Sequence, residues 1–160
     1  MYTYIAVERK KKWRGTGVEM SNLALRLAKT NAKIQQVYNR IKFINSDIDK
    51  IYSGKYDLIV TNPPYINNID YNNLNSGVKN FEPKMALYGG RDGLDIIEKV
   101  IRKSKLILKN NGLIAIEIGL GQHYNVAKLL EKNGFYIFKT IKDYQKIKRC
   151  FLAKKINEKF

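Results

Sequence analysis

Residues 62–65, Asn62-Pro63-Pro64-Tyr65, are the part of this 160-residue chain that points most directly to chemistry. The Asn62 side-chain oxygen and the Pro63 carbonyl are two hydrogen-bond acceptors, and the stiff Pro-Pro unit holds the backbone carbonyl in one direction. Two convergent acceptors suit a planar NH₂ group, whose nitrogen then directs its remaining electrons at an electrophile. Tyr65 can stack on the plane of that group. The residue types therefore predict a site at which a planar nitrogen is the nucleophile.

The surroundings of these four residues support this interpretation. The apolar run over residues 56–61 predicts a buried strand that stops at the prolines, because proline cannot donate to a strand ladder. In open α/β sheets, ligands bind beyond the carboxyl ends of the strands, which is where residues 62–65 fall. The alternative is a strand-ending turn without a function. Residues 66–90 are rich in Asn and too long for a simple connection, so we expect a substrate-facing loop there.

Short apolar runs alternate with helical stretches along the chain, which is the βαβ pattern of an α/β domain with a mostly parallel sheet. Ser21 is expected to cap a helix that has Leu23, Leu27 and Ala28 on one face. Asn110-Asn111-Gly112 is expected to end a helix that carries Leu94, Ile97, Val100, Ile101 and Leu108. The remaining expected elements are strands over residues 17–20, 41–44 and 113–118, an antiparallel pair over 135–140 and 149–154, and helices over 2–12 and 124–132.

The composition is that of one globular domain. Aromatic residues make up 11% and hydrophobic residues 44%, which is enough for a core. No apolar run approaches the about 18 residues that a membrane-spanning helix needs. The single cysteine excludes an internal disulfide framework, and the first residues lack the order of a secretory signal, so we expect a cytoplasmic protein without membrane association.

The chain contains 30 Lys and Arg against 14 Asp and Glu, a formal net charge of +16. Such a charge is typical of proteins that meet polyanions such as nucleic acid or the ribosome. Lysines scattered along the chain beside many Asn, Ile and Tyr residues are also what an AT-rich genome produces. Only residues 9–14 form a dense basic run, so the charge does not identify a partner.

Several further segments accompany the Asn-Pro-Pro-Tyr segment, by which we mean residues 62–65. They are Asp57-Leu58-Ile59-Val60-Thr61 before it, and Ile66, Glu82-Pro83-Lys84-Met85-Ala86-Leu87, Gly89-Gly90, Asp92-Gly93-Leu94 and Glu117-Ile118-Gly119 with Gln122 after it. With these motifs the chain resembles, from about residue 15 to residue 156, the peptide chain release factor N5-glutamine methyltransferases. The resemblance implies a Rossmann-like class I methyltransferase fold. It also implies S-adenosyl-L-methionine as the cofactor, and as the substrate the glutamine of the Gly-Gly-Gln loop of class 1 release factors.

The resemblance also assigns roles to the Asn-Pro-Pro-Tyr segment. Asn62 and the Pro63 carbonyl would hold the glutamine amide, Pro64 would keep the turn rigid, and Tyr65 would line the pocket. All four are the implied catalytic and substrate-binding residues, and Asn62 would also border the cofactor.

Four acidic residues complete the implied site. Glu19 matches the position that binds the cofactor's ribose hydroxyls, and Asp47 would accept from the adenine amino group, unless it is simply a solvated turn residue. Glu82 and Glu117 would shape the substrate pocket. The alternative for these two is a carboxylate that pairs with one of the many nearby lysines.

The chain departs from the family pattern in three places. A first strand with its Gly-rich turn and the family's small N-terminal helical domain are both missing, and Ile147-Lys148-Arg149 replaces the usual Asn-Asp-Arg before the last strand. We therefore expect residues 1–160 to be a single, N-terminally truncated catalytic domain without a separate release-factor-binding domain. Loss of the central strand should leave two unpaired strand edges.

Other functions stay open at this point. Asn-Pro-Pro-Tyr is shared with adenine-N6 DNA and RNA methyltransferases, and a chain without the Gly-rich turn is also compatible with an inactive truncated remnant. His123 and Cys150 have no partners at ligand spacing, so we expect a surface histidine, a buried strand thiol and no metal site. A monomer is the expected oligomeric state.

Overall fold

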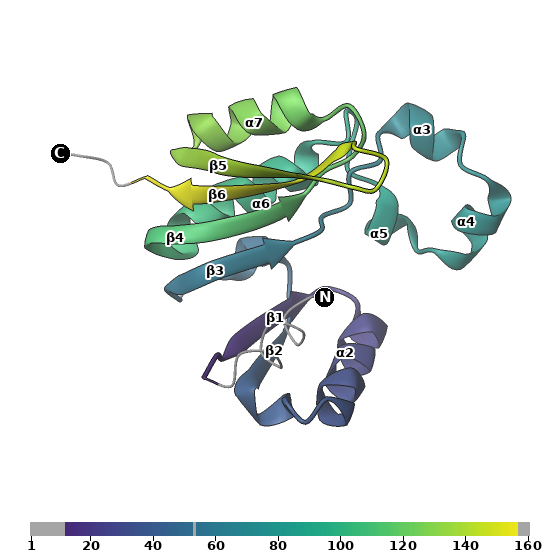
Figure 1. Ribbon diagram of the computed structural model, residues 1–160. Coiled ribbons are helices and arrows are strands. Elements are labelled where there is room, and N and C mark those ends of the chain that lie inside the picture. Colours follow the sequence, from purple (N-terminus) through teal and green to yellow (C-terminus); the bar gives the residue numbers. More distant parts are fainter. Residues whose placement is uncertain (1–11, 53, 157–160) are drawn as a thin grey trace. The chain divides into compact units, whose positions relative to one another are not determined.

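The computed structural model describes residues 12–52 and 54–156, which form two compact units divided at Ser53 and Gly54 (Figure 1). The helix expected over residues 2–12 lies almost wholly outside the described residues.

The first unit contains two parallel strands joined by a helix. Strand β1 (Gly15–Glu19) pairs with β2 (Ile41–Asn45), and α2 (Asn22–Ile34) connects them, followed by the short 3₁₀ helices η1 (Tyr38–Arg40) and η2 (Ile48–Lys50). Ser21 caps α2 as predicted, because its hydroxyl accepts from the Ala24 N–H at 3.2 Å. The βα unit expected from the sequence is confirmed.

The buried face of α2 differs from the predicted one. Leu25, Ala28 and Ala32 are buried, whereas Leu23 and Leu27 are 78% and 61% exposed. Spacings of three and four residues place the buried trio on one stripe of the helix, while Leu23 and Leu27 form a neighbouring stripe. The prediction that Ala28 shares its face with both leucines was therefore wrong.

The second unit is built on a four-stranded sheet with the order β3-β4-β6-β5. Strands β3 and β4 are parallel, and β6 lies between β4 and β5, antiparallel to both, which confirms the predicted C-terminal pair. Helices α6 and α7 run along this sheet (Figure 1). The elements are β3 (Tyr56–Thr61), α6 (Asp95–Ile107), β4 (Leu108–Glu117), α7 (His123–Lys132), β5 (Phe135–Lys142) and β6 (Lys148–Lys155).

Alternate residues of β4 build the core of this unit. Ile114 and Ile116 of β4, and Ile118 directly after it, are fully buried against apolar residues of both helices and of the two antiparallel strands, among them Ile97, Ile101, Val126, Leu130, Phe135 and Phe151. Strand β3, by contrast, is half-buried rather than buried as predicted, and Val60 is 44% exposed. The reason is that, within the described residues, β3 pairs only with β4.

Strand β1 has one pairing partner among the residues that the structure describes, which is β2. Within those residues β1 and β3 each have one unpaired edge, whereas the loss of a central strand, from which such edges were expected, stays a prediction.

Helix α6 ends earlier than predicted. Its last residue is Ile107, and Leu108 has an extended backbone whose N–H still donates to Ser104. Asn110-Asn111-Gly112 lies inside β4, where the register jumps from the pair Tyr56–Leu108 to the pair Leu58–Leu113. Asn111 has a φ of 62°, so the Asn-Asn-Gly sequence forms an irregularity of the strand and not a helix cap.

Residues 66–90 form three short helices where one long loop was expected. Asn67 and Asn75 accept from backbone N–H groups at the starts of the first two, and Pro83 precedes the third. Asn67 and Asn75 thus act as helix caps, which accounts for two of the asparagines of this stretch. In Figure 1 these helices lie beyond the carboxyl ends of β3 and β4. They are α3 (Asn68–Asn72), α4 (Ser76–Phe81) and α5 (Lys84–Leu87).

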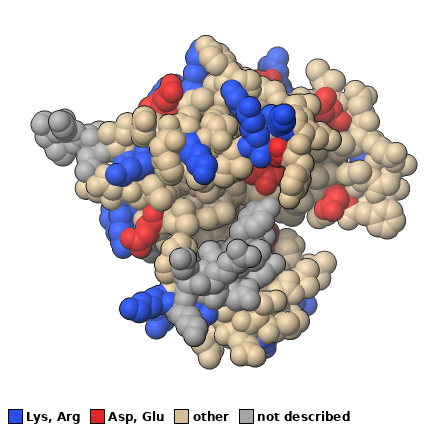
Figure 2. Space-filling model, viewed as in Figure 1, with Lys and Arg blue, Asp and Glu red and all other residues tan. Residues whose placement is uncertain are grey.

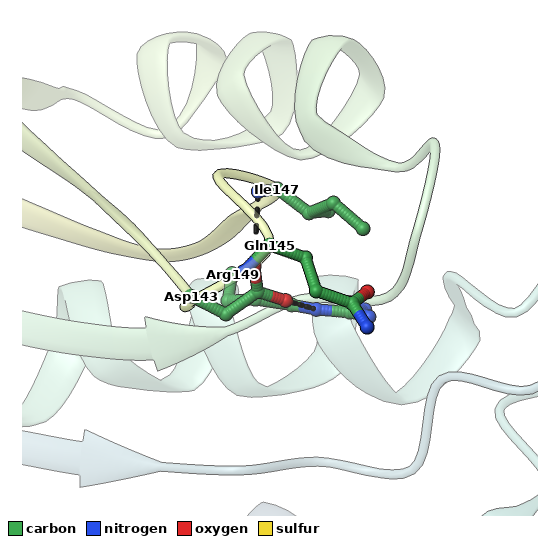
Figure 3. A network of polar contacts seen from close by, with 4 residues as sticks. All are labelled: Asp143, Gln145, Ile147 and Arg149. Carbon is green, nitrogen blue, oxygen red and sulfur yellow. Dashed lines mark hydrogen bonds and ion pairs between the residues drawn. The ribbon is translucent and has the colours of Figure 1, made fainter.

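Asp143 organises the turn between β5 and β6 (Figure 3). Its carboxylate accepts from the N–H groups of Gln145 and Ile147, both at 2.9 Å, and from Arg149 Nε at 3.0 Å. Burial acts to raise the pKa of Asp143, but the hydrogen bonds from Arg149, Ile147 and Gln145, with the charge of Arg149, outweigh it and lower the pKa. The unusual Ile147-Lys148-Arg149 sequence is thus accommodated in an ordered turn.

We expect Asp143→Asn to destabilise the chain at pH 7 and to have no effect in strong acid. A carboxylate whose pKa is lowered by folding stabilises the folded state above its ordinary pKa of about 4, and this contribution is lost as the pH falls through the lower folded-state pKa. Urea unfolding of wild type and variant from pH 7 downward measures the difference. Asp57→Asn is the control, since Asp57 forms an exposed ion pair with Lys109, which contributes little to stability. A wild-type-to-variant difference independent of pH would contradict the prediction.

No helix in the described ranges is both long and apolar enough to cross a bilayer.

Candidate functional site

The Asn-Pro-Pro-Tyr segment directly follows β3, at the carboxyl end of that strand, as predicted. The strand ends here because neither proline has an N–H to donate to a neighbouring strand. Asn62 is exposed, Pro63 is buried, and Pro64 and Tyr65 are half-buried. The segment therefore presents the Asn62 side chain to solvent on a backbone whose middle is packed.

A loop at residues 89–93 contacts the backbone of the segment. The Ile66 N–H donates to the Leu87 carbonyl at 3.0 Å, and the Gly89 N–H donates to the Ile66 carbonyl at 2.9 Å. A Cβ on Gly89 would lie 2.7 Å from both the Pro64 carbonyl oxygen and the Tyr65 Cα. Glycine is required at residue 89 because the two backbones touch there.

The turn after β4 supports Tyr65 from another side. A Cβ on Gly119 would lie 2.9 Å from Cδ2 of the Tyr65 ring, so the ring packs on this glycine. Tyr65 also packs against the core of the unit. Its ring is consequently held in place by the protein before any ligand binds.

Gln122 joins these three segments. Its Nε2 donates to the carbonyl oxygens of Tyr65 at 2.9 Å and Gly93 at 3.1 Å, and its Oε1 accepts from the Gly119 N–H at 2.9 Å. The sequence identified Gln122 only as part of the family motif and assigned it no role. The available signal was the three-residue spacing from Gly119 at the start of a helix, which lets one side chain fold back onto the preceding turn.

The two acidic residues expected near the substrate lie on different elements. Glu117 is the half-buried last residue of β4, directly opposite Cys150 of β6. Glu82 is exposed and is the C-cap residue that follows α4. Within the described residues, Glu82 makes no hydrogen bond to the Asn-Pro-Pro-Tyr segment, so a role for this residue in the pocket remains a prediction.

Glu19 and Asp47 lie at the carboxyl ends of the parallel strands of the first unit. The Glu19 carboxylate accepts from the Ser21 N–H at 2.9 Å, and Asp47 caps η2 by accepting from the Asp49 N–H at 3.1 Å. The Ser46 N–H donates to the Glu19 carbonyl at 3.1 Å, which joins the two strand ends. The structure brings the two carboxylates to adjacent strand ends, and the turn role anticipated as the alternative for Asp47 is real.

The lone histidine and cysteine are placed differently. His123 is exposed, as predicted, whereas Cys150 is half-buried and not fully buried. Burial raises the pKa of the Cys150 thiol, and the negative charge of Glu117 raises it further. Within residues 12–52 and 54–156, no group of three or more His, Cys, Asp and Glu side chains is placed to hold a metal ion.

We expect Cys150 to react slowly with iodoacetamide at pH 8, because a raised pKa leaves little nucleophilic thiolate. Glu117→Gln removes a negative charge opposite the thiol, which lowers the pKa of the thiol, and should accelerate alkylation by roughly 3-fold. Mass spectrometry of timed samples measures the rate. Glu131→Gln, the same substitution at an exposed residue of α7, should leave the rate unchanged. Equal rates for both variants would show that Glu117 does not act on the thiol.

Comparison with known proteins agrees with this architecture. The family model of the methyltransferase small domain matches residues 2–77. A release factor glutamine methyltransferase of Clostridium acetobutylicum is 39% identical over 138 residues, covering 84% of this chain and 48% of that protein. A ribosomal protein uL3 glutamine methyltransferase of Francisella tularensis is 37% identical over 109 residues, 68% of this chain and 34% of that protein. The chain thus spans about half the length of these relatives, or less.

Solved structures identify the fold. A methyltransferase from Pyrococcus furiosus superimposes with a TM-score of 0.69 at 16% identity, over 98% of this chain and 72% of that one. The class I methyltransferase fold predicted from the sequence is therefore confirmed. The prediction that residues 1–160 are one truncated catalytic domain stays a prediction.

Proposed function

Because the chain has the class I methyltransferase fold and resembles the release factor glutamine methyltransferases over most of its length, we propose that it methylates the side-chain amide of a glutamine. The substrate we propose is the glutamine of the Gly-Gly-Gln loop of class 1 release factors. The proposal rests on the position of the Asn-Pro-Pro-Tyr segment at the carboxyl end of β3, where Gly89 and Gly119 lie in close contact with it.

Two acceptors of the segment would bind the substrate amide. The Asn62 side-chain oxygen and the Pro63 carbonyl each accept one of the two N–H groups, which leaves the nitrogen's remaining electrons available to the methyl donor. Tyr65 forms a wall of the pocket, with its ring packed on Gly119. When the nitrogen takes a methyl group from the bound cofactor, the methyl–sulfur bond would break and S-adenosyl-L-homocysteine would be the leaving group. The nitrogen would become more positive, acceptors already in place would stabilise that charge without rearranging, and one N–H proton would then pass to solvent.

S-adenosyl-L-methionine is the cofactor of this methyltransferase family and supplies the methyl group when bound. We propose that the Glu19 carboxylate accepts from its ribose hydroxyls and that Asp47 accepts from its adenine amino group. The chemistry of the two residues fits, because both are hydrogen-bond acceptors at the ends of adjacent parallel strands. Asn62 would border the cofactor as well as the substrate.

The competing substrate is an adenine amino group in DNA or RNA, which is also a planar NH₂. The net charge of +16 favours contact with nucleic acid or the ribosome. However, on the face seen in Figure 2 the Lys and Arg side chains stand in several separate groups and do not merge into one basic surface. Preference for a protein substrate rests on the similarity to the release factor glutamine methyltransferases.

The test is transfer of a labelled methyl group from S-adenosyl-L-methionine by the purified protein. We expect label in a class 1 release factor and none in a release factor whose Gly-Gly-Gln glutamine is replaced by alanine. Label in ribosomal protein uL3, DNA or RNA instead of the release factor would overturn the proposed substrate. An absence of label in all four would overturn the enzymatic proposal itself and favour an inactive remnant.

A further inference from the structure

We propose that Gln122 is a positioning residue that holds the Asn-Pro-Pro-Tyr segment in its reactive geometry. The inference rests on the proposed function for its kinetic consequence, but its structural part does not. The Gln122 amide uses both of its N–H groups and its oxygen in the three hydrogen bonds to Tyr65, Gly93 and Gly119.

This set of bonds requires an amide. Two carbonyl oxygens need two donors, and one backbone N–H needs an acceptor, which an amide side chain supplies within a single planar group. A glutamate of the same shape would instead direct a carboxylate oxygen at the carbonyls of Tyr65 and Gly93. A methionine would fill a similar volume and form none of these bonds.

Hydrogen bonds therefore hold the end of the segment from two sides. Gln122 holds the Tyr65 carbonyl, while the next residue, Ile66, donates to Leu87 and accepts from Gly89. The backbone that leads back to Asn62 therefore has little freedom to move. A side chain that binds substrate needs a rotamer and a backbone fixed by such supporting contacts.

Gln122 is itself held in place by a packed helix. Gln122 immediately precedes α7, whose Val126 and Leu130 are fully buried in the core, and the Val126 N–H donates to the Gln122 carbonyl at 3.0 Å. Gln122 thus ties the segment to the sheet through a helix that is itself packed. The Gln122 side chain thus adds hydrogen bonds between the turn after β4 and the segment to the packing of the Tyr65 ring on Gly119.

The opposite end of α7 provides a matched control. The Asn133 side chain donates to the Leu129 carbonyl at 2.7 Å and belongs to the C-cap of the helix. Asn133→Ala removes one side-chain bond from α7 but touches neither the segment nor the loop at residues 89–93. It therefore reports what a loss of helix stability alone would do.

The first readout is amide hydrogen exchange of Ile66 and Gly89 in the unliganded protein. In Gln122→Glu and Gln122→Met, exchange at both amides should accelerate roughly 10-fold, as expected for loss of a hydrogen bond or two. In Asn133→Ala it should match wild type. Wild-type exchange in both Gln122 variants, or equal acceleration in Asn133→Ala, would overturn the proposal.

The second readout separates positioning from binding. For the release factor substrate, kcat of both Gln122 variants should fall roughly 10-fold, with the cofactor dissociation constant unchanged. Wild-type kcat in these variants would overturn the inference while leaving the proposed function intact. If the wild-type protein methylates nothing, the proposed function fails, and hydrogen exchange still decides whether Gln122 holds the segment.

Discussion

Asn62→Ala is expected to lower kcat for methyl transfer by roughly 10²-fold, the effect typical of removing one preorganised group that stabilises developing charge. The variant leaves the substrate amide with the Pro63 carbonyl as its remaining acceptor. The nitrogen then has no fixed orientation, and the positive charge that grows on it loses a stabilising dipole. Steady-state kinetics with labelled S-adenosyl-L-methionine and a release factor measure the loss.

The fold should tolerate this substitution, because Asn62 is exposed. We expect the midpoint of urea unfolding and the cofactor dissociation constant to stay at their wild-type values. Asn125→Ala, at an exposed residue of α7, controls for the loss of an asparagine elsewhere and should leave kcat unchanged. If Asn62→Ala kept wild-type kcat, Asn62 would have no part in the chemistry.

Gly93→Ala is expected to damage both stability and catalysis. Gly93 has a φ of 74°, which alone costs an alanine about 1–2 kcal/mol. The new Cβ would also overlap the Tyr65 carbonyl oxygen and would lie 2.7 Å from Gln122 Nε2. Since the contacted atoms belong to the backbone next to Pro64 and to the residue that holds it, the overlap must displace the segment or the loop.

Gly121→Ala separates the two causes. Gly121 has a φ of 78°, and an added Cβ there meets no atom within 4 Å, so this variant carries the same backbone strain without the overlap. We expect Gly93→Ala to lower the free energy of unfolding by about 1–3 kcal/mol more than Gly121→Ala, the usual cost of overpacking. It should also lower kcat about 10-fold or more, which Gly121→Ala should not do.

Equal losses of stability in the two variants, with equal kcat, would show that the loop at residues 89–93 can move to make room for the Cβ at little cost in free energy. The close approach to Tyr65 would then have no consequence for the site. Urea unfolding and steady-state kinetics on both variants provide this comparison.

Local signals in the sequence were sufficient to predict much of this protein. The prolines ended β3 at Thr61, Ser21 capped α2, and Asn133-Gly134 ended α7, where Gly134 has a φ of 77°. Each of these depends on the stereochemistry of one or two residues and is independent of the rest of the fold. The position of the Asn-Pro-Pro-Tyr segment at a strand end followed from the same reasoning.

Other features depend on contacts between residues that are far apart in the sequence. Leu23 and Leu25 are similar in chemistry, yet only Leu25 is buried, because packing selects one stripe of α2. Asn110-Asn111-Gly112 has the composition of a helix cap, but pairing between β3 and β4 draws these residues into a strand.

The hydrogen bonds that hold the candidate site in place are the clearest example of contacts between residues far apart in the sequence. Gln122 and Tyr65 are 57 residues apart, and nothing in the local sequence of either indicates that they share a hydrogen bond. The chemistry of the Asn-Pro-Pro-Tyr segment is a property of four adjacent residue types. Its rigidity depends on a glutamine and glycines that only the folding of the chain brings into contact with it, because such contacts arise from the packing of whole elements.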